Sequence, residues 1–191
     1  MLLEMFPSPI WVRDLEGTEL AWLSQQIDQA LAATELPRDT TRHWVETNYH
    51  QHPNWIELHH QQALKQLIEE NSVSFQMEVG DPEPHNYWIA DSWVNRYEFG
   101  GYMSDHEHPG FVISGVYFHR ADPSMGGSLC FRNPTMMPRM GEWPGSRIPE
   151  YQEIEIEAQT GRIVLFPSWL THSVATVKSG EKISISFNLS R

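Results

Sequence analysis

The end of the chain alternates strictly between apolar and polar residues. From residue 182 to 190 the sequence reads Lys-Ile-Ser-Ile-Ser-Phe-Asn-Leu-Ser, so every second position is apolar. Successive side chains of a strand point to opposite faces. The pattern therefore predicts a strand over residues 182–190 with one apolar face and one polar face.

Seven further segments read as short strands, because apolar and β-branched residues gather between Gly, Pro, Asn and Asp. They are residues 87–97, 103–108, 112–119, 127–132, 153–157, 161–166 and 172–177. A succession of short strands separated by turn residues is typical of a sandwich or a barrel. We therefore predict a mainly β fold with flanking helices packed outside it.

The first part of the chain follows a helical period instead. Apolar residues recur at three- and four-residue spacing over residues 17–34 and again over residues 54–70, which predicts two helices. At 191 residues the chain is most simply one domain, 1–191. We expect residues 1–86 to form a helical support region and residues 87–191 to form the β core.

An irregular insertion interrupts the predicted core at residues 133–150, where proline, methionine and glycine are frequent. Such segments are lids or binding loops when they are functional, and are disordered when they are not. Trp143 is the residue of this insertion that best suits a contact with substrate.

Composition narrows the classes of function. Lys and Arg number 13 against 25 Asp and Glu, which gives a formal net charge of −12. A nucleic-acid partner is disfavoured, because phosphate backbones are bound by surplus Lys and Arg. No apolar run is long enough to cross a membrane, and the first residues lack the pattern of a secretory signal. The single cysteine, Cys130, suits a reducing cytoplasm, where we expect the protein to act.

Three histidines are the strongest chemical signal. His106 and His108 are two positions apart on a predicted strand, so both can project from one face. His172 follows an apolar strand that ends in a proline-marked turn. Together they predict a facial metal site whose opposite side is open, which is typical of non-haem Fe(II) oxygenases. A His-x-His pair alone is a weak signal, because exposed strands carry histidines too.

The order and spacing of the motifs resemble the 2-oxoglutarate and Fe(II)-dependent oxygenase superfamily over roughly residues 88–190. The resemblance rests on Asn95–Gly100, His106–Pro109, Ser114–Phe118, Gly161–Pro167, His172 and Lys182–Asn188. It is closest to small bacterial and phage members, and extends to the prolyl 4-hydroxylase branch. It implies a core that is a double-stranded β-helix, a cupin-like jelly roll.

This resemblance implies a dioxygenase that hydroxylates its substrate while 2-oxoglutarate is oxidatively decarboxylated to succinate. The implied cofactor is Fe(II), with 2-oxoglutarate and O₂ as cosubstrates and ascorbate as a reductant. The implied metal ligands are His106, His108 and His172. By analogy the substrate is an amino acid, a peptide or a protein side chain, and a homodimer stays open.

One position departs from the superfamily's pattern. The usual first motif is His-x-Asp or His-x-Glu, and this chain has His108 where the carboxylate stands. Asp105 and Glu107 have the wrong strand parity to replace it. We therefore expect a three-histidine site. The fallback is an inward swing of Asp105 or Glu107, or a site with two protein ligands.

The resemblance also places residues around the cosubstrate. Lys182, ten residues after His172, matches the basic anchor of the distal carboxylate, and Ser184 shares its strand face. Tyr97 matches a cosubstrate-binding tyrosine, and Asn95 matches an asparagine of the nucleic-acid demethylase branch. Without the resemblance, Lys182 is equally a solvated turn residue, and Tyr97 and Asn95 are ordinary polar groups of a β core.

Two other functions fit the same residues. A three-histidine iron site also resembles thiol dioxygenases, which need no 2-oxo acid because the substrate itself chelates the metal. A jelly roll that binds zinc or a small acid without turnover is the non-enzymatic alternative. Elsewhere in the chain, His119 shares strand parity with Tyr117 and could approach the cavity, but we assign it no role in the site, and Trp93 reads as a packing residue.

Overall fold

The computed structural model describes residues 8–40, 44–51, 54–134 and 153–191. The N-terminal elements are β1 (Trp11–Asp14), α1 (Gly17–Leu31), β2 (Arg38–Asp39), β3 (Val45–Thr47), α2 (Trp55–Leu58) and α3 (Gln62–Glu78). The elements that follow are β4 (Trp88–Tyr97), β5 (Met103–His106), β6 (Ile113–Arg120), the 3₁₀ turn η1 (Pro123–Met125), β7 (Leu129–Arg132), β8 (Glu153–Ile156), β9 (Arg162–Pro167), β10 (His172–Val174) and β11 (Lys182–Ser190).

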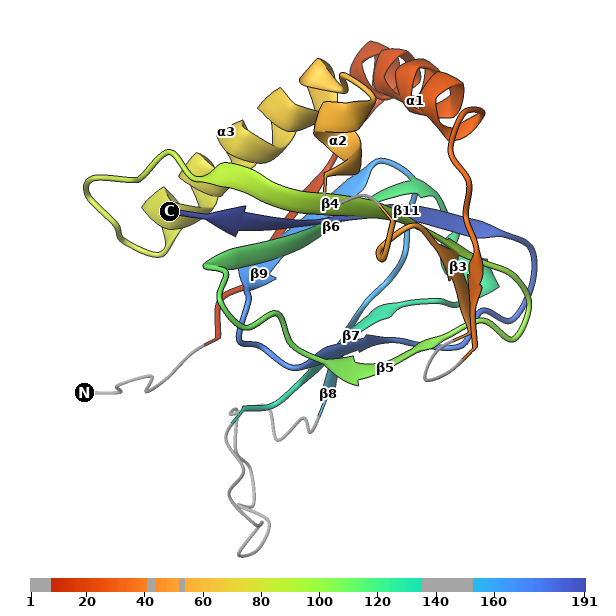
Figure 1. Cartoon of the computed structure of the whole chain (residues 1–191). Helices are drawn as coiled ribbons and strands as arrows, with labels where there is room; N and C mark the ends of the chain where they lie inside the picture. The colour runs from red at the N-terminus through yellow and green to blue at the C-terminus, as the bar shows by residue number, and fades with distance from the viewer. Residues whose placement is uncertain (1–7, 41–43, 52–53, 135–152) are drawn as a thin grey trace, which may run out of the picture.

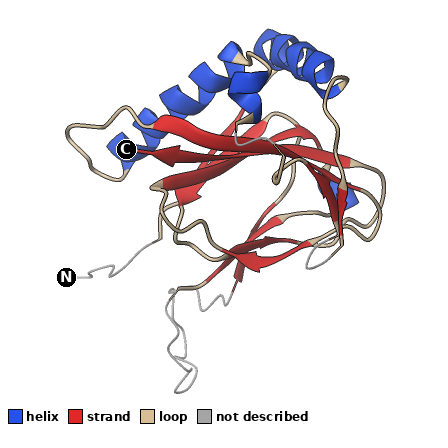
Figure 2. Cartoon of the chain, in the orientation of Figure 1, coloured by secondary structure: helices blue, strands red, loops and turns tan. Residues whose placement is uncertain are grey.

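The described strands form two sheets that face each other. The larger sheet has seven strands in the order β1-β9-β6-β11-β4-β3-β2, and the smaller has four in the order β5-β10-β7-β8. Figure 1 shows the helices α1, α2 and α3 lying over the outer face of the larger sheet, with the smaller sheet on the opposite side. Figure 2 shows the same division into one helical layer and two strand layers.

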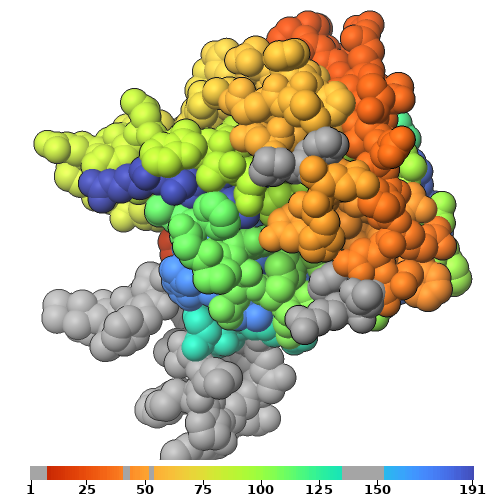
Figure 3. Space-filling view, viewed as in Figure 1, coloured from red at the N-terminus to blue at the C-terminus, as the bar shows by residue number. Residues whose placement is uncertain are grey.

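The alternation of apolar and polar residues on β11 explains why the helices pack on one face of the larger sheet and the smaller sheet lies on the other. Ile183, Ile185 and Leu189 are each no more than 1% exposed and belong to a core shared with Ile27 of α1 and Leu64 of α3. This core lies between the helices and the larger sheet. The space-filling view shows the N-terminal segments, red to yellow, gathered on this side of the molecule (Figure 3). Apolar burial on the outer face therefore leaves the polar face of β11 turned toward the smaller sheet.

A second apolar cluster lies between the two sheets. It includes Val116 and Phe118 of β6, Phe166 of β9 and Phe131 of β7. The rings of Phe131 and Phe166 meet edge to face, 4.9 Å between centroids. Val116, Phe118 and Phe166 of this cluster also line the space between the sheets.

The mainly β fold with flanking helices is confirmed, and all eight predicted strands are present with ends that differ by up to three residues. Three short strands, β1, β2 and β3, come from residues 1–86 and join the edges of the larger sheet. Sequence analysis missed them because strands of two to four residues carry no readable alternation. Of the predicted insertion 133–150, residues 135–150, Trp143 among them, lie outside the described residues.

The predicted helix over residues 54–70 is wrong in its bounds. The chain forms a short helix, α2, which ends at Leu58, and then a longer one, α3, which runs to Glu78. Between them His60 has a positive φ of 51° and is exposed, so it belongs to a turn. A residue in the left-handed region interrupts a right-handed helix. The apolar spacing continues across this turn, which is why one helix was predicted instead of two.

Candidate metal centre

The three histidines come together although His172 is far from the other two in the sequence. His106 at the end of β5 pairs with His172 at the start of β10. Each of His106, His108 and His172 offers a ring nitrogen, and the three nitrogens lie within 4.8 Å of one another. The ring centroids of His106 and His172 are 4.3 Å apart, and that of His108 is 5.1 Å from each. This is a spacing that a single ion can bridge.

His108 does not lie on a strand, contrary to the predicted strand over residues 103–108. β5 ends at His106, and His108 follows in irregular backbone before Pro109. Its backbone N–H donates to the Ser168 carbonyl over 3.0 Å. Strand pairing therefore positions His106 and His172, whereas contacts with the β9–β10 turn position His108.

Two of the three imidazoles are oriented by backbone carbonyls. His106 Nδ1 lies 2.8 Å from the Ser104 carbonyl oxygen, and His172 Nδ1 lies 2.9 Å from that of Leu170. A carbonyl oxygen only accepts, so each Nδ1 carries the proton in these bonds and each Nε2 keeps its lone pair. Histidine ligands are commonly held in this way, with one nitrogen on a hydrogen-bond partner and the other on the metal.

Burial keeps two of the rings neutral. Burial, together with the neighbouring His106, lowers the pKa of His172 to about 3 and that of His108 to about 4. Neutral imidazole is the form that binds a metal. The site therefore needs no deprotonation of these two rings near neutral pH.

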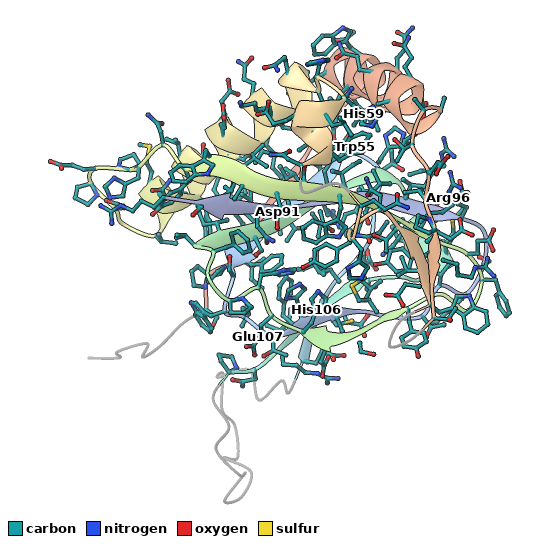
Figure 4. The ribbon with its side chains drawn as sticks, in the orientation of Figure 1. Trp55, His59, Asp91, Arg96, His106 and Glu107 are labelled. Atoms are coloured by element: carbon teal, nitrogen blue, oxygen red, sulfur yellow. The ribbon has the colours of Figure 1, made fainter. Side chains whose placement is uncertain are left out.

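The two acids beside the histidines have other partners. Asp105 accepts from Arg132 Nε over 3.0 Å, and Glu107 accepts from the Thr171 hydroxyl over 2.5 Å. In Figure 4 the labelled His106 and Glu107 lie on the side of the smaller sheet, below Asp91 of β4. Neither acid belongs to the group of nitrogens described above. Among the described residues the trio therefore has no carboxylate beside it, which differs from a site with a carboxylate ligand.

A cavity between the sheets continues from the histidines toward Lys182. Its walls include Trp93, Asn95, Tyr97, Phe166, Lys182 and Ser184, together with the three histidines. Lys182 lies opposite Tyr97 and Ser184 lies opposite Asn95 in the pairing of β11 with β4. The four residues that the sequence places around the cosubstrate therefore share one cavity with the candidate metal ligands.

Lys182 is the most unusual residue of this cavity. It is 1% exposed, and its Nζ donates to the Gly127 carbonyl over 2.8 Å. The same atom lies 4.4 Å from the centroid of the Tyr97 ring. Within the described part of the chain it has no carboxylate partner, and burial lowers its pKa from 10.5 to about 7. Burial without an anion destabilises the charged amine, so the cavity is suited to receive one.

Asn95 and Tyr97 contribute polar atoms to the same wall. Asn95 Nδ2 donates to Ser186 Oγ over 3.0 Å, while its buried Oδ1 has no hydrogen-bond partner among the described residues. Burial also raises the pKa of Tyr97, so its hydroxyl stays protonated and can donate. One of the two Asn95 amide atoms is therefore available to a ligand, whichever way the amide is oriented.

A wider groove adjoins the cavity on its other side. Its walls include Asp39, Tyr49, His50 and Glu107. Trp93, Asn95, Met103, His106 and His108 line both the cavity and the groove. The histidines thus lie where a narrow buried space meets an open one.

Sequence reasoning misjudged one residue of the β core, Trp93. Trp93 lines both spaces, and its ring centroid is 5.6 Å from that of His108, so it is more than a packing residue. Its strand parity with Asn95 and Tyr97 was the available signal. His119, by contrast, turns away from the cavity, because its Nε2 bonds to Asp28 of α1 over 2.8 Å. The larger sheet packs its Tyr117 face against the helices, and His119 follows that face.

The donor set fits a divalent transition metal. Three imidazoles suit iron, copper, nickel and zinc, and the described residues supply no fourth protein ligand to the group. A site with three protein ligands keeps positions for water or substrate, as catalytic sites do. The geometry is therefore that of an open metal centre beside an anion cavity.

A comparison with protein families agrees with this geometry. Residues 91–188, which are 98 of the 191 residues, match the family described as "Putative 2OG-Fe(II) oxygenase". The chain belongs to this 2OG-Fe(II) oxygenase family. The family's cofactors are Fe(II) and 2-oxoglutarate, and His106, His108 and His172 can hold the iron. A comparison with curated protein sequences gives no match.

Solved structures share the fold at low sequence identity. A prolyl-4-hydroxylase from Pseudomonas putida is 14% identical with a TM-score of 0.63, covering 96% of this chain and 93% of that one. A prolyl hydroxylase from Trichoplax adhaerens, in complex with a hypoxia inducible factor peptide fragment, is 15% identical with a TM-score of 0.62, covering 95% and 83%. The epimerase SnoN, in complex with Fe³⁺, α-ketoglutarate and nogalamycin RO, is 12% identical with a TM-score of 0.63, covering 96% and 79%.

These likenesses confirm the jelly-roll fold of the oxygenase family. In the part of the chain that the structure describes, no helix is both long and apolar enough to cross a membrane.

Proposed function

We propose that the protein is a 2-oxoglutarate- and Fe(II)-dependent dioxygenase that hydroxylates an amino acid, a peptide or a protein side chain. Oxidative decarboxylation of 2-oxoglutarate to succinate accompanies this reaction. The observation that carries the proposal is Lys182, a buried cation without a carboxylate partner among the described residues, in the same cavity as three convergent histidines.

Lys182 binds the distal carboxylate of 2-oxoglutarate in this proposal. The carboxylate of 2-oxoglutarate is the anion that stabilises the buried amine. A charge-assisted hydrogen bond from Lys182 Nζ to this carboxylate replaces the present bond to the Gly127 carbonyl. Lysine is a point cation and does not by itself orient a carboxylate. Ser184, two residues along on the same strand face, supplies a hydroxyl that does. Tyr97 and Asn95 line the same wall and complete the polar contacts.

The three histidines hold Fe(II), and the aromatic residues protect it. Phe166 lies 4.6 Å from the His172 ring and Trp93 lies 5.6 Å from that of His108, between centroids. These apolar surfaces limit the access of water to the ligands. When bound, Fe(II) and 2-oxoglutarate supply the oxidising chemistry with O₂, whereas the protein supplies orientation and shelter.

The groove beside the histidines is the site for the substrate. It shares His106 and His108 with the cavity and opens to solvent past Tyr49 and Glu107. Relatives of the same fold include a prolyl hydroxylase in complex with a peptide fragment. This analogy, and the open groove, support a substrate that presents a side chain, alone or within a peptide.

The test is a spectroscopic titration without oxygen. Protein mixed with Fe(II) and 2-oxoglutarate is expected to develop a weak visible charge-transfer band, and to form succinate when O₂ is admitted. Lys182→Met should need about 100 times more 2-oxoglutarate for the same band, because it removes the only cation proposed to meet the distal carboxylate. Lys178→Met is the matched control, since Lys178 is exposed and lies outside the cavity. Absence of both band and succinate in the unaltered protein would refute the proposal.

A three-histidine iron site that works without 2-oxoglutarate is the second candidate, and the neutral ligand set favours it. The same variant separates the two functions. If the enzyme oxidises a thiol substrate equally well in the Lys182→Met form, and consumes no 2-oxoglutarate, the second candidate is correct. Tightly bound zinc with a closed tetrahedral shell would instead indicate a binding protein.

A further inference from the structure

His108 differs from the other two histidines in what holds its ring. The Nδ1 atoms of His106 and His172 each bond to a backbone carbonyl. Among the described residues, the contact of His108 Nδ1 is with a side chain, since the Asn188 carboxamide nitrogen lies 3.5 Å away. The orientation of the His108 ring therefore depends on Asn188, which lies outside the proposed cosubstrate site.

Asn188 belongs to a closed chain of contacts that begins and ends at His108. The His108 backbone N–H donates to the Ser168 carbonyl over 3.0 Å. The Ser168 and Ser114 hydroxyls are 2.9 Å apart, and Ser114 Oγ is 2.7 Å from Asn188 Oδ1. Ser114, Ser168 and Asn188 are each 1% exposed. Buried polar groups of this kind must satisfy one another, so a change in one affects the orientation of the others.

The chain joins segments that hold His108 from three directions. Ser114 lies on β6, Asn188 on β11, and Ser168 in the turn between β9 and β10. His108 itself lies beyond the end of β5, where no strand pairing restrains it. The Asn188 main chain is held in turn, because β11 pairs with both β4 and β6 at this position. The network therefore provides for His108 what strand pairing provides for His106 and His172.

A carboxamide can determine which nitrogen of His108 carries the proton. Its oxygen accepts and its nitrogen donates, and a half-turn about its terminal bond exchanges the two. When the oxygen faces Nδ1, that nitrogen must carry the proton, and Nε2 keeps the lone pair that a metal needs. In that orientation the amide nitrogen donates to the Ser114 hydroxyl, which donates to Ser168. The His108 Nδ1 proton, one amide hydrogen and the Ser114 hydroxyl then each have an acceptor, whereas the amide nitrogen gives up its hydrogen bond to the Asp91 carboxylate.

We propose that Asn188 is a positioning residue for the third metal ligand: its carboxamide oxygen accepts the Nδ1 proton of His108 and so directs Nε2 to the metal. The inference rests on the proposed function, because it takes His108 to be a ligand. His108 stands where the family has a carboxylate ligand, and it lies on irregular backbone. The Asn188 amide and the hydroxyls of Ser114 and Ser168 hold its ring in one tautomer and one orientation.

The test uses Co(II), whose visible spectrum reports its binding without any turnover. Asn188→Leu retains the size of the side chain and loses its hydrogen bonds, so the Co(II) dissociation constant should rise about 10- to 100-fold. Asn188→Asp keeps an acceptor at the same place and should stay within about tenfold of the unaltered protein. The matched control is Asn71→Leu, which removes another carboxamide that is 1% exposed, on α3 on the far side of the larger sheet. It should lower the melting temperature and leave Co(II) affinity unchanged.

A second measurement reads the tautomer directly. Protein labelled with ¹⁵N-histidine and loaded with Zn(II) should show His108 with a protonated Nδ1 and a metal-bound Nε2. Coordination of His108 through Nδ1 would overturn the inference, and so would a folded Asn188→Leu protein that binds Co(II) as tightly as the unaltered one. If the unaltered protein binds no Co(II), the proposed function fails together with the inference. Binding of Co(II) that is insensitive to Asn188 leaves the proposed function standing and refutes the inference alone.

Discussion

The two faces of β11 are buried to nearly the same extent, yet they meet different surroundings. Ile183, Ile185 and Leu189 pack against the helices and are at most 1% exposed. Lys182 and Asn188 on the other face are equally buried, each 1% exposed, but Lys182 lines the cavity between the sheets and Asn188 contacts His108. Apolar burial stabilises the fold directly, whereas a buried cation or amide stabilises it only when it has a partner. One face therefore maintains the fold, and the other carries polar side chains to the space between the sheets.

The largest effect should follow from damage to the apolar face. Ile185→Ala removes a side chain that is 0% exposed, and should lower the free energy of unfolding by about 2–5 kcal/mol. The affinity for 2-oxoglutarate of the protein that stays folded should not change, because the lost atoms point toward the helices. Denaturant unfolding and an isothermal titration measure the two quantities. A large loss of affinity without loss of stability would contradict the division between the faces.

A smaller effect should follow from crowding the polar face. Gly127 has a φ of +73°, and a Cβ there would lie 3.0 Å from Lys182 Cδ. Gly127→Ala should therefore cost about 1–2 kcal/mol of stability through backbone strain. It should also weaken 2-oxoglutarate binding about tenfold, a change of about 1.4 kcal/mol, because Lys182 has to move.

Gly100→Ala is the matched control for that experiment. Gly100 has a φ of +82° and no neighbour within 4 Å of a Cβ placed there. It should show the same strain and an unchanged affinity for 2-oxoglutarate. Equal losses of affinity in the two variants would mean that general destabilisation, and not displacement of Lys182, is the cause.

A third effect should appear in the pH dependence of stability. Burial lowers the pKa of Lys182 from 10.5 to about 7, so between these values the unfolded chain binds a proton that the folded chain does not. The contribution of Lys182 to the free energy of unfolding should therefore rise as the pH rises from about 7 to about 9. Below about pH 7 both states hold the proton, and the contribution becomes constant.

Comparison with Lys182→Met isolates this term from other titrating groups. The unaltered protein should gain stability relative to the variant over this pH range, and saturating 2-oxoglutarate should reduce the gain by keeping the amine charged in the folded state. Urea unfolding at about pH 7 and about pH 9 measures this gain in stability. The assignment of the buried amine fails if the two proteins respond identically to pH.

The alternation over residues 182–190 predicted β11 and both of its faces, because a strand's period is local. The family resemblance likewise placed Lys182, Ser184, Asn95 and Tyr97, and register brought them into one cavity. Where the period was too short to read, as in β1, β2 and β3, or continued across a turn, as at His60, the prediction failed. Local pattern gives the face of a residue, but not the end of its element.

By itself, the amino-acid sequence determined the fold class, the family and the identity of the three histidines. Only the tertiary structure decided how they meet: His106 and His172 through the pairing of β5 with β10, and His108 from outside any strand. It also brought Asn188 and Ser114, 74 residues apart, to the same buried site. The physical reason is that contacts between distant segments depend on packing and register, which no local periodicity specifies.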